Sequence, residues 1–438
     1  MRILIISPAI YDSRGDLIRQ NRIWLPGLTL PYLAALLPAH HEIVIVDETS
    51  EEIPKDHPWD LVLISSIGAS LIRATEIAVL FRSRNIPVIA GGIAASLTPP
   101  DGYSQYFTSF VKGEAETIIG EILMDYEKGE LKKNYKGQIA DLTNSPIPRY
   151  ELMNKHTIGY WMPVQSSRGC IHKCPFCSVS AFNNGNFRKF PIEYVVACIR
   201  KIKKLGYSYI TLIDDSIASD INHLHDLCRA LIPLKIYWMS QCTIDIAEHP
   251  EILSLMAKSG CTMLSFGIES VSKESICSIN KNFNKVEKYK EYFRIIRSYG
   301  IDISTEMMIG LDGDTEEIFD DFYDFAMQNN ISLPRFYILT PVPGTKLFAE
   351  LESQNRIFNN DLGSYNGSKL VFYPKKLSQK SLEDNYWKMY EKVYSFPNIM
   401  RRYILTRPKR SFFSNVFILA ANFHYKKHIG QRIPPGIV

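Results

Sequence analysis

The sequence predicts an α/β protein with a doubly wound parallel sheet, then a partial (β/α)6 barrel, then a mostly helical C-terminal segment. Three observations support this fold class. Short apolar runs alternate with amphipathic stretches along residues 1–345. Most of these runs end in a turn of small or acidic residues. A proline-punctuated stretch separates two such series, which gives domains at 1–125 and 159–345, a linker at 126–158 and a C-terminal segment at 346–438.

Length and composition limit the class of protein. The chain has 438 residues, of which 46% are hydrophobic and 22% are charged, as expected of a globular protein. The formal net charge of +4 is too small to indicate nucleic-acid binding. Five of the eight cysteines are scattered singly, so we expect no disulfide framework and a reducing, cytoplasmic location. No apolar run is long enough to predict a membrane-spanning helix.

The first domain begins with Arg2–Ser7, an apolar run that ends at Pro8, as a buried parallel strand would. Further strands are predicted at Glu42–Asp47, Asp60–Ser66, Ile86–Ala90 and near Phe107–Val111. Helices are predicted at Leu30–Leu37 and near Arg73–Arg82. In a doubly wound sheet, ligands bind beyond the carboxyl ends of the strands. The candidate ligand residues there are Ser7, Pro8, Ser65, Ser66, Gly68, Gly91, Gly92, Gly113 and Glu114. Taken singly, each glycine is better explained as a plain turn or a helix cap.

The linker is predicted from two features: Lys128–Lys136 is highly charged, and Asn144–Pro148 contains two prolines. The second domain then starts with a strand at 162–168. Five more strands are predicted at Tyr209–Ile213, Lys235–Met239, Thr262–Phe266, Asp302–Met308 and Arg335–Thr340. Six strands with intervening helices, such as amphipathic Pro191–Leu205, predict a partial barrel whose site lies at the carboxyl ends of the strands.

Three cysteines lie close together at the end of the first barrel strand. Cys170, Cys174 and Cys177 form a C-x3-C-x2-C pattern within Ser167–Ser180. Three thiolates this close converge on one metal or iron–sulfur site. Three cysteines on a cubane would leave one iron open to a substrate. A zinc site completed by His172 or by a distant residue is the alternative, but the spacing is not that of zinc ribbons.

With Phe176 just before its last cysteine, this triplet resembles the cluster motif of radical S-adenosylmethionine (SAM) enzymes. The resemblance implies a [4Fe–4S] cluster whose open iron chelates SAM, reductive cleavage of SAM to a 5′-deoxyadenosyl radical, and a reductant such as flavodoxin or ferredoxin. It also implies SAM-binding residues beside the cluster. The matching positions in this sequence are Phe176, Asp214, Asp215, Gln241, Glu269 and Gly310. At the turn after Gly310 the sequence departs from the family pattern, because Asp312 and Asp314 replace a proline and a glutamate.

Residues 1–125 resemble the cobalamin-binding domain that precedes the radical SAM domain in one large subgroup. The resemblance rests on the segments LPGLTLPYLAALL, DLVLISSIGASLIRATEIA, IPVIAGGIAAS and VKGEAET. It implies that these residues bind cobalamin. The D-x-H-x-x-G motif that supplies a histidine to cobalt in methionine synthase is absent, so we expect no histidine on cobalt. A relic domain that binds nothing is the alternative.

The C-terminal segment combines basic residues with an apolar run from Phe412 to Ala421. It could lie on a membrane surface or line a pocket for an apolar substrate. A core helix with a basic solvated face is the favoured interpretation. His424 and His428 are spaced i, i+4 and are expected to be surface residues rather than metal ligands.

The resemblance implies a cobalamin-dependent radical SAM methyltransferase that acts on an unactivated carbon of a small molecule, which could be hydrophobic. One alternative is a radical SAM cyclase, oxidase or rearrangement enzyme, with or without cobalamin. The other is a non-catalytic iron–sulfur or corrinoid-binding protein. No nucleic-acid partner is expected.

Overall fold

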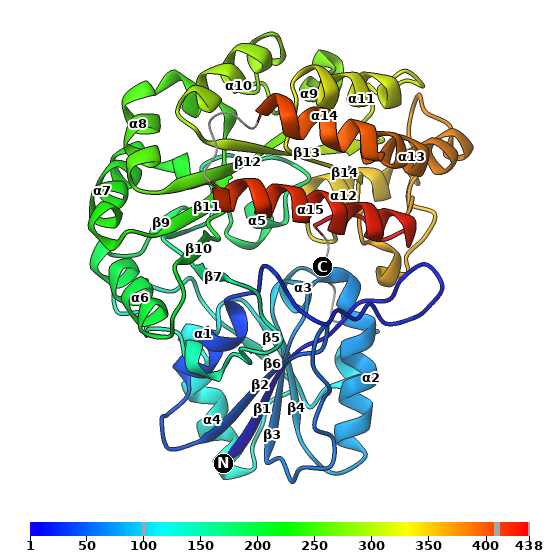
Figure 1. Ribbon diagram of the computed structural model, residues 1–438. Coiled ribbons are helices and arrows are strands. Elements are labelled where there is room, and N and C mark those ends of the chain that lie inside the picture. The colour runs from blue at the N-terminus through cyan, green and yellow to red at the C-terminus, as the bar shows by residue number, and fades with distance from the viewer. Residues whose placement is uncertain (99–101, 407–411, 437–438) are drawn as a thin grey trace.

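The computed structural model describes residues 1–98, 102–406 and 412–436. It contains two six-stranded parallel sheets, one within residues 2–136 and one within residues 161–338, and a two-stranded ladder inside the second domain. The first sheet lies below the second in Figure 1, with its strands pointing toward the second domain. The fold class predicted from the sequence is confirmed.

The first sheet has the strand order β2-β1-β3-β4-β5-β6, and all its pairs are parallel. Its strands are β1 (Arg2–Ser7), β2 (Glu42–Asp47), β3 (Leu61–Ser65), β4 (Val88–Gly91), β5 (Ser109–Lys112) and β6 (Asn134–Lys136). Its helices are α1 (Thr29–Leu36), α2 (Leu71–Arg82), α3 (Ile93–Leu97) and α4 (Ile119–Lys128). The structure differs from the prediction at β6, because these residues fall in the predicted linker but extend the first sheet. Only Tyr135 of this strand is buried, so it carries no apolar pattern.

The second sheet has the order β14-β13-β12-β11-β10-β7, with parallel pairs throughout. Its strands are β7 (Trp161–Val164), β10 (Tyr209–Leu212), β11 (Tyr237–Cys242), β12 (Cys261–Glu269), β13 (Asp302–Ile309) and β14 (Leu333–Ile338). Since β7 and β14 are the two edges, the barrel is partial, as predicted. The helices around it are α5 (Ser178–Phe182), α6 (Ile192–Lys204), α7 (Ile221–Leu231), α8 (Pro250–Lys258), α9 (Lys273–Ser278), α10 (Tyr289–Ser298) and α11 (Ile318–Gln328).

Two strands are longer than predicted, and this changes where two candidate residues lie. β11 continues through Gln241, and β12 continues through Glu269. Both residues were expected in loops after their strands. Glu269 ends its strand with a φ of 62°, a left-handed conformation that is rare for glutamate.

The C-terminal segment is helical, as predicted, with α12 (Lys346–Ser353), α13 (Gln379–Val393), α14 (Phe396–Thr406) and α15 (Phe412–Gly430). Helix α15 packs against the barrel sheet rather than only against other helices. Ile418 forms a buried cluster with Trp161, Met239, Met263 and Leu333, which come from four different strands of the barrel. None of the helices in the described ranges is long and apolar enough to cross a bilayer.

Candidate functional site

The cysteine loop is closed at its base by a short antiparallel ladder. Strand β8 (Ser167–Arg168) pairs with β9 (Arg188–Lys189), so the loop between them carries all three cysteines of the motif. Gly169 starts the loop with a φ of 88°, and a Cβ there would lie 1.9 Å from the carbonyl oxygen of Asn186. Only glycine fits such a position, so this residue fixes how the chain enters the loop.

The three cysteine side chains are partly buried and close enough to influence one another. Burial raises the pKa of the Cys174 thiol to about 11, and the neighbouring Cys177 and Cys170 add to this rise, while Lys281 opposes it. Burial also raises the pKa of Cys177. A metal or cluster would hold these sulfurs as thiolates, because a coordinating thiol is deprotonated outright. Three cysteines on one loop that influence one another electrostatically, with an ammonium group nearby, suit an anionic iron–sulfur cluster. His172, the candidate for a zinc site, instead stacks on Phe283 with ring centroids 3.8 Å apart.

Asp214 and Asp215 hold the entrance of this loop. Asp214 is buried, and its carboxylate accepts backbone N–H groups of Ser166 at 2.7 Å and Ser167 at 3.0 Å, together with the Ser166 hydroxyl. Asp215 accepts the N–H of Gly169 at 2.8 Å. The sequence assigned both residues to SAM. In the structure the Asp214 oxygens accept hydrogen bonds from the protein backbone and a hydroxyl, whereas Asp215 is half-buried beside the cysteines.

Glu269 has a protein partner that the sequence did not reveal. The Lys281 ammonium lies 2.5 Å from Glu269 Oε1 and donates to the carbonyl of Gly267 at 2.8 Å. Both side chains are buried, and burial raises the pKa of Glu269. Lys281 also interacts electrostatically with Cys174, so it places a positive charge at the cysteine site. No motif marked this lysine, since it follows helix α9 at a turn and lies 12 residues beyond its partner.

The Gly310 turn is stabilised by Asp314, which replaces the glutamate of the family pattern. The N–H groups of Gly310 and Leu311 both donate to Asp314 Oδ2, at 2.9 and 3.0 Å. The Ser275 hydroxyl donates to the other oxygen at 2.5 Å. The aspartate side chain, which is shorter than glutamate, therefore stabilises the turn by accepting hydrogen bonds from its backbone. It is buried, and its burial raises its pKa to about 6.

Gln241 belongs to a polar strip that crosses four barrel strands. Its amide donates to Glu306 Oε1 at 3.4 Å, and Arg335 reaches the same oxygen at 2.6 Å. Arg335 also donates to the Ser265 hydroxyl at 2.7 Å. Only Gln241 of this strip was predicted. Alternate residues of parallel strands face one side of a sheet, so Glu306 and Arg335 could be found only once the register was known.

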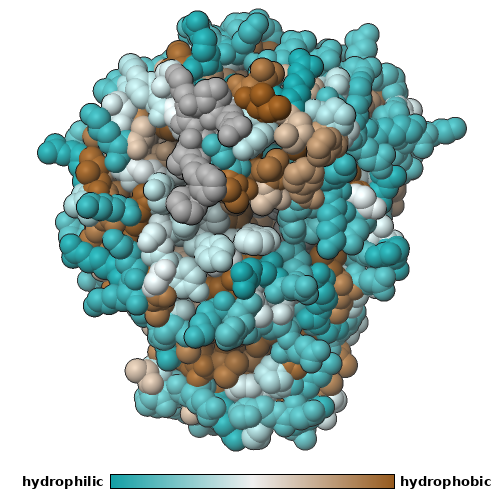
Figure 2. All heavy atoms as spheres, in the orientation of Figure 1, coloured by the Kyte–Doolittle hydropathy of each residue, from teal (hydrophilic) through white to brown (hydrophobic). Residues whose placement is uncertain are grey.

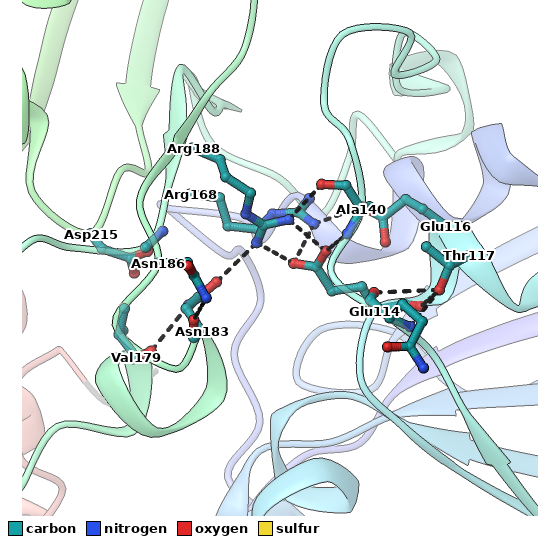
Figure 3. Close-up of polar contacts among 12 residues, drawn as sticks. Glu114, Glu116, Thr117, Ala140, Arg168, Val179, Asn183, Asn186, Arg188 and Asp215 are labelled. Atoms are coloured by element: carbon teal, nitrogen blue, oxygen red, sulfur yellow. Dashed lines mark hydrogen bonds and ion pairs between the residues drawn. The ribbon is translucent and has the colours of Figure 1, made fainter.

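Glu114 contacts the base of the cysteine loop, as Figure 3 shows. Its carboxylate lies 3.0 Å from Arg168 Nη1 and 2.6 Å from Arg188 Nη2, and it accepts the N–H of Ala140 at 2.6 Å. Arg168 also pairs with Glu116 at 2.7 Å. Burial alone would raise the pKa of Glu114, but the two guanidinium groups and the N–H bond hold it at about 2. The sequence assigned Glu114 to cobalamin, and here it joins the first domain to the second.

A cavity of about 1050 Å³ lies between the carboxyl edge of the first sheet and the barrel. Of the candidate cobalamin residues, Ser7, Pro8, Ser65, Ser66 and Gly92 line it. Gly68, Gly91, Gly113 and Glu114 are not among the lining residues, nor are the cysteines and the SAM candidates. The structure therefore brings five of the nine first-domain candidates to one surface.

The shape of this edge suits a large ligand. Gly92 has a φ of 92°, and a Cβ there would lie 2.8 Å from Ser65 Oγ and 2.9 Å from the carbonyl of Ser66. The Ser66 hydroxyl is buried and has no hydrogen-bond partner within the protein, so it is available to a ligand group. No histidine of the first domain lines the cavity in the described residues, and the one histidine that does, His424, comes from α15. These features fit cobalamin without a first-domain histidine on cobalt.

Helix α15 forms the opposite wall of the cavity through Phe417, Ile418, Ala421, His424 and Tyr425. The favoured sequence interpretation of a plain core helix is therefore incomplete, because this face lines a cavity. His428 was expected at the surface but is buried, and burial together with the nearby His424 lowers its pKa to about 4. The described residues contain no group of three or more His, Cys, Asp or Glu placed to hold a single metal ion.

Comparison with known families places the cysteine loop in a recognised domain. Residues 164–326 match the radical SAM superfamily. This segment runs from the end of β7 to α11, so it contains the cysteines and most of the barrel.

Three curated relatives extend over most of the chain. The bacteriochlorophyllide d C-12(1)-methyltransferase of Chlorobaculum tepidum is 29% identical and covers 91% of this chain and 88% of its own. The hopanoid C-2 methylase of Rhodopseudomonas palustris is 26% identical over 82% of this chain and 72% of its own. The anaerobic magnesium-protoporphyrin IX monomethyl ester cyclase of Cereibacter sphaeroides is 24% identical over 92% of this chain and 74% of its own.

Two solved structures share the fold over most of this chain. The cobalamin-dependent SAM radical enzyme OxsB, with aqua-cobalamin and SAM bound, superposes with a TM-score of 0.68 at 12% identity, covering 98% of this chain and 71% of its own. The radical SAM methyltransferase TsrM of Kitasatospora setae, with cobalamin and a [4Fe–4S] cluster bound, gives 0.63 at 17% identity, covering 81% and 78%.

Proposed function

We propose that this radical SAM enzyme is a cobalamin-dependent C-methyltransferase that acts on an unactivated carbon of an apolar small molecule. The observation that carries the proposal is the cavity between the first sheet and the barrel. It joins the cobalamin candidates of the first domain to an apolar wall of the second. The cysteines do not line this cavity, but α3, which begins beside Gly92 at its edge, packs against α5 of the cysteine loop.

The cofactors would supply a carbon-centred radical and a transferable methyl group. The protein's own residues hold and shield these groups. Cys170, Cys174 and Cys177 would ligate the cluster, and Lys281 and Glu269 would face SAM with one charge of each sign. Asp215 and Gly310 lie in the turns that would border SAM. Ser7, Ser65 and Ser66 would contact cobalamin through small side chains, and Gly92 through its backbone.

An apolar substrate is supported by the walls of the cavity. Trp161, Met263, Phe417, Ala421 and Tyr425 contribute to the barrel side of the lining. Cavities of this character exclude water, which protects a radical from side reactions. Two of the relatives are named as a methyltransferase of bacteriochlorophyllide d and a methylase of hopanoids. A one-electron donor such as flavodoxin or ferredoxin would reduce the cluster.

Ring formation or oxidation by the same radical is the second candidate. It is favoured by one observation, the resemblance to the magnesium-protoporphyrin cyclase over 92% of this chain. The cofactors would be the same, and only the fate of the substrate radical would differ.

The two candidates differ in the mass of the product. The reconstituted enzyme would be supplied with SAM labelled with deuterium in its methyl group, a reductant, and bacteriochlorophyllide d or a hopanoid as a trial substrate. Methyl transfer predicts a product that has gained one fully deuterated methyl group, together with 5′-deoxyadenosine. A product with no added carbon would contradict the methyltransferase proposal and support ring formation or oxidation.

A further inference from the structure

The positive charge of the chain is concentrated at its C-terminal end. Residues 396–438 contain eight Lys and Arg and no Asp or Glu. The rest of the chain therefore has a formal charge of −4, although the whole has +4. Such an asymmetry between parts of one chain points to an acidic partner for the basic part.

The same segment exposes large apolar side chains. On α14, Ile404 and Leu405 are 56% and 57% exposed, and they share one face of the helix with exposed Arg401 and Pro397. The opposite face, with Ile399 and Arg402, is buried. An apolar and basic outer face on a helix that also has a buried face is typical of surface helices that bind lipid.

Helix α15 continues this exposed surface. Val416, Ala420, Phe423 and Lys427 recur at helical spacing along one face, and all four are exposed. Phe423 contacts Phe396 at the start of α14, with ring centroids 6.1 Å apart. Figure 2 shows hydrophobic residues gathered over the α14–α15 region on this side of the molecule. Val416 and Ala420 also line the large cavity, so the exposed face reaches its mouth.

The two helices are held firmly against the barrel. Buried Arg402 donates to the carbonyl of Val393 at 2.5 Å and to the side chain of Asn422 at 2.9 Å. Asn422 in turn donates to the carbonyl of Ser332 beside β14. The exposed face is therefore presented by a fixed scaffold, so its side chains need little reordering to bind a flat partner.

We propose that the α14–α15 face, defined by Arg401, Ile404, Leu405, Phe423, Lys426 and Lys427, docks on the surface of an anionic lipid bilayer. The apolar side chains enter the headgroup boundary, and the basic residues pair with lipid phosphates. The mouth of the cavity then lies at the membrane, where an apolar substrate is concentrated. The proposed membrane docking is separate from the methyltransferase activity. It does not depend on whether the enzyme transfers a methyl group or forms a ring.

The test is co-sedimentation of the full-length, anaerobically purified protein with vesicles of phosphatidylcholine, with or without phosphatidylglycerol. We expect binding to the anionic vesicles and weakening with added salt. Leu405→Asp should lower the partition coefficient about tenfold, because one large side chain no longer enters the boundary. The double variant Lys426→Glu, Lys427→Glu should lower it about tenfold or more.

Matched controls separate docking from a loss of folding. Met124→Asp changes a side chain on α4 that is 55% exposed, and Lys128→Glu changes an exposed lysine on the same helix. Both should bind vesicles as the wild type does. Iron content and the circular dichroism spectrum should be unchanged in all variants.

Three outcomes would overturn the proposal. The first is no binding of the wild type to anionic vesicles. The second is binding that Leu405→Asp and Met124→Asp reduce equally. The third is a dimer in light scattering that Leu405→Asp dissociates without any vesicle binding, which would assign this face to a second copy of the chain.

Discussion

At the scale of single residues, the Glu114 carboxylate faces two guanidinium groups that flank the cysteine loop. Arg168 and Arg188 are opposite each other in the β8–β9 ladder, so one carboxylate of the first domain binds both sides of the loop base. All three side chains are largely buried, and removing one partner of such a group leaves uncompensated charge.

Glu114→Gln should therefore lower the free energy of unfolding at neutral pH by about 3–5 kcal/mol. The pKa of Glu114 is about 2 in the folded protein against an ordinary value of 4.5. Because the folded value is the lower one, the stabilisation is present above pH 4.5 and is lost as the pH falls toward 2. Urea denaturation at a series of pH values should show this acid-dependent loss in the wild type and a flatter profile in Glu114→Gln.

Glu121→Gln is the matched control for this experiment. Glu121 forms an ion pair with Lys132 at 2.5 Å, but both side chains are largely exposed. Exposed pairs contribute about 0–1 kcal/mol, so this variant should resemble the wild type. If both variants lost the same free energy of unfolding, the buried Glu114 carboxylate would contribute no more to stability than an exposed ion pair does.

Some site residues can be predicted from the sequence, whereas others depend on the tertiary structure. The cysteines are recognisable because three ligands to one site lie within eight residues. For Asp214 the sequence leaves the role open, because an acidic residue after a strand can bind either a ligand or a neighbouring backbone, and only the tertiary structure reveals its backbone partners. Lys281 was missed because its partner Glu269 belongs to another element.

At the scale of elements, helix α15 forms one wall of the cavity. The sequence alone did not show which side chains of this helix face the cavity and which face the core. Ala421 lines the cavity from this helix, whereas Leu419 packs against the core and does not line it. The variant Ala421→Phe should fill part of the cavity and raise the KM for an apolar substrate about tenfold or more, with a smaller effect on kcat.

Leu419→Phe places the same bulk on the same helix, away from the cavity. It should cost about 1–3 kcal/mol of stability through overpacking and leave the KM unchanged. Steady-state kinetics of the two variants show whether the KM depends on the face of α15 that lines the cavity. If both raise the KM alike, α15 does not contact the substrate.

The parallel strands were predictable because they are continuous apolar runs bounded by turns, as in Arg2–Ser7 and Glu42–Asp47. Strand β6 was missed because two of its three residues are exposed and polar. The face of α15 was misjudged because the helix is apolar on most sides, so periodicity alone does not distinguish a core face from a cavity wall.

At the scale of the whole molecule, the carboxyl edge of the first sheet faces the second domain. Helix α3, which begins beside Gly92 at the cavity, packs against α5 of the cysteine loop. Gly344 after β14 lies against Leu97 at the end of α3, where a Cβ would be 2.9 Å from the Leu97 carbonyl. A ligand on the first sheet would therefore lie beside the cysteine site. This juxtaposition could not be predicted from either domain alone.

The first domain is expected to hold cobalamin at this edge without a protein histidine on cobalt. The direct measurement is the electron paramagnetic resonance spectrum of the cob(II)alamin form, after expression with hydroxocobalamin and anaerobic purification. We expect a retained corrinoid whose cobalt signal shows no superhyperfine splitting from an imidazole nitrogen. Nitrogen splitting would contradict the histidine-free site and would direct attention to His424, which lines the cavity. If no corrinoid were retained, the cobalamin assignment and the methyltransferase proposal would both be wrong.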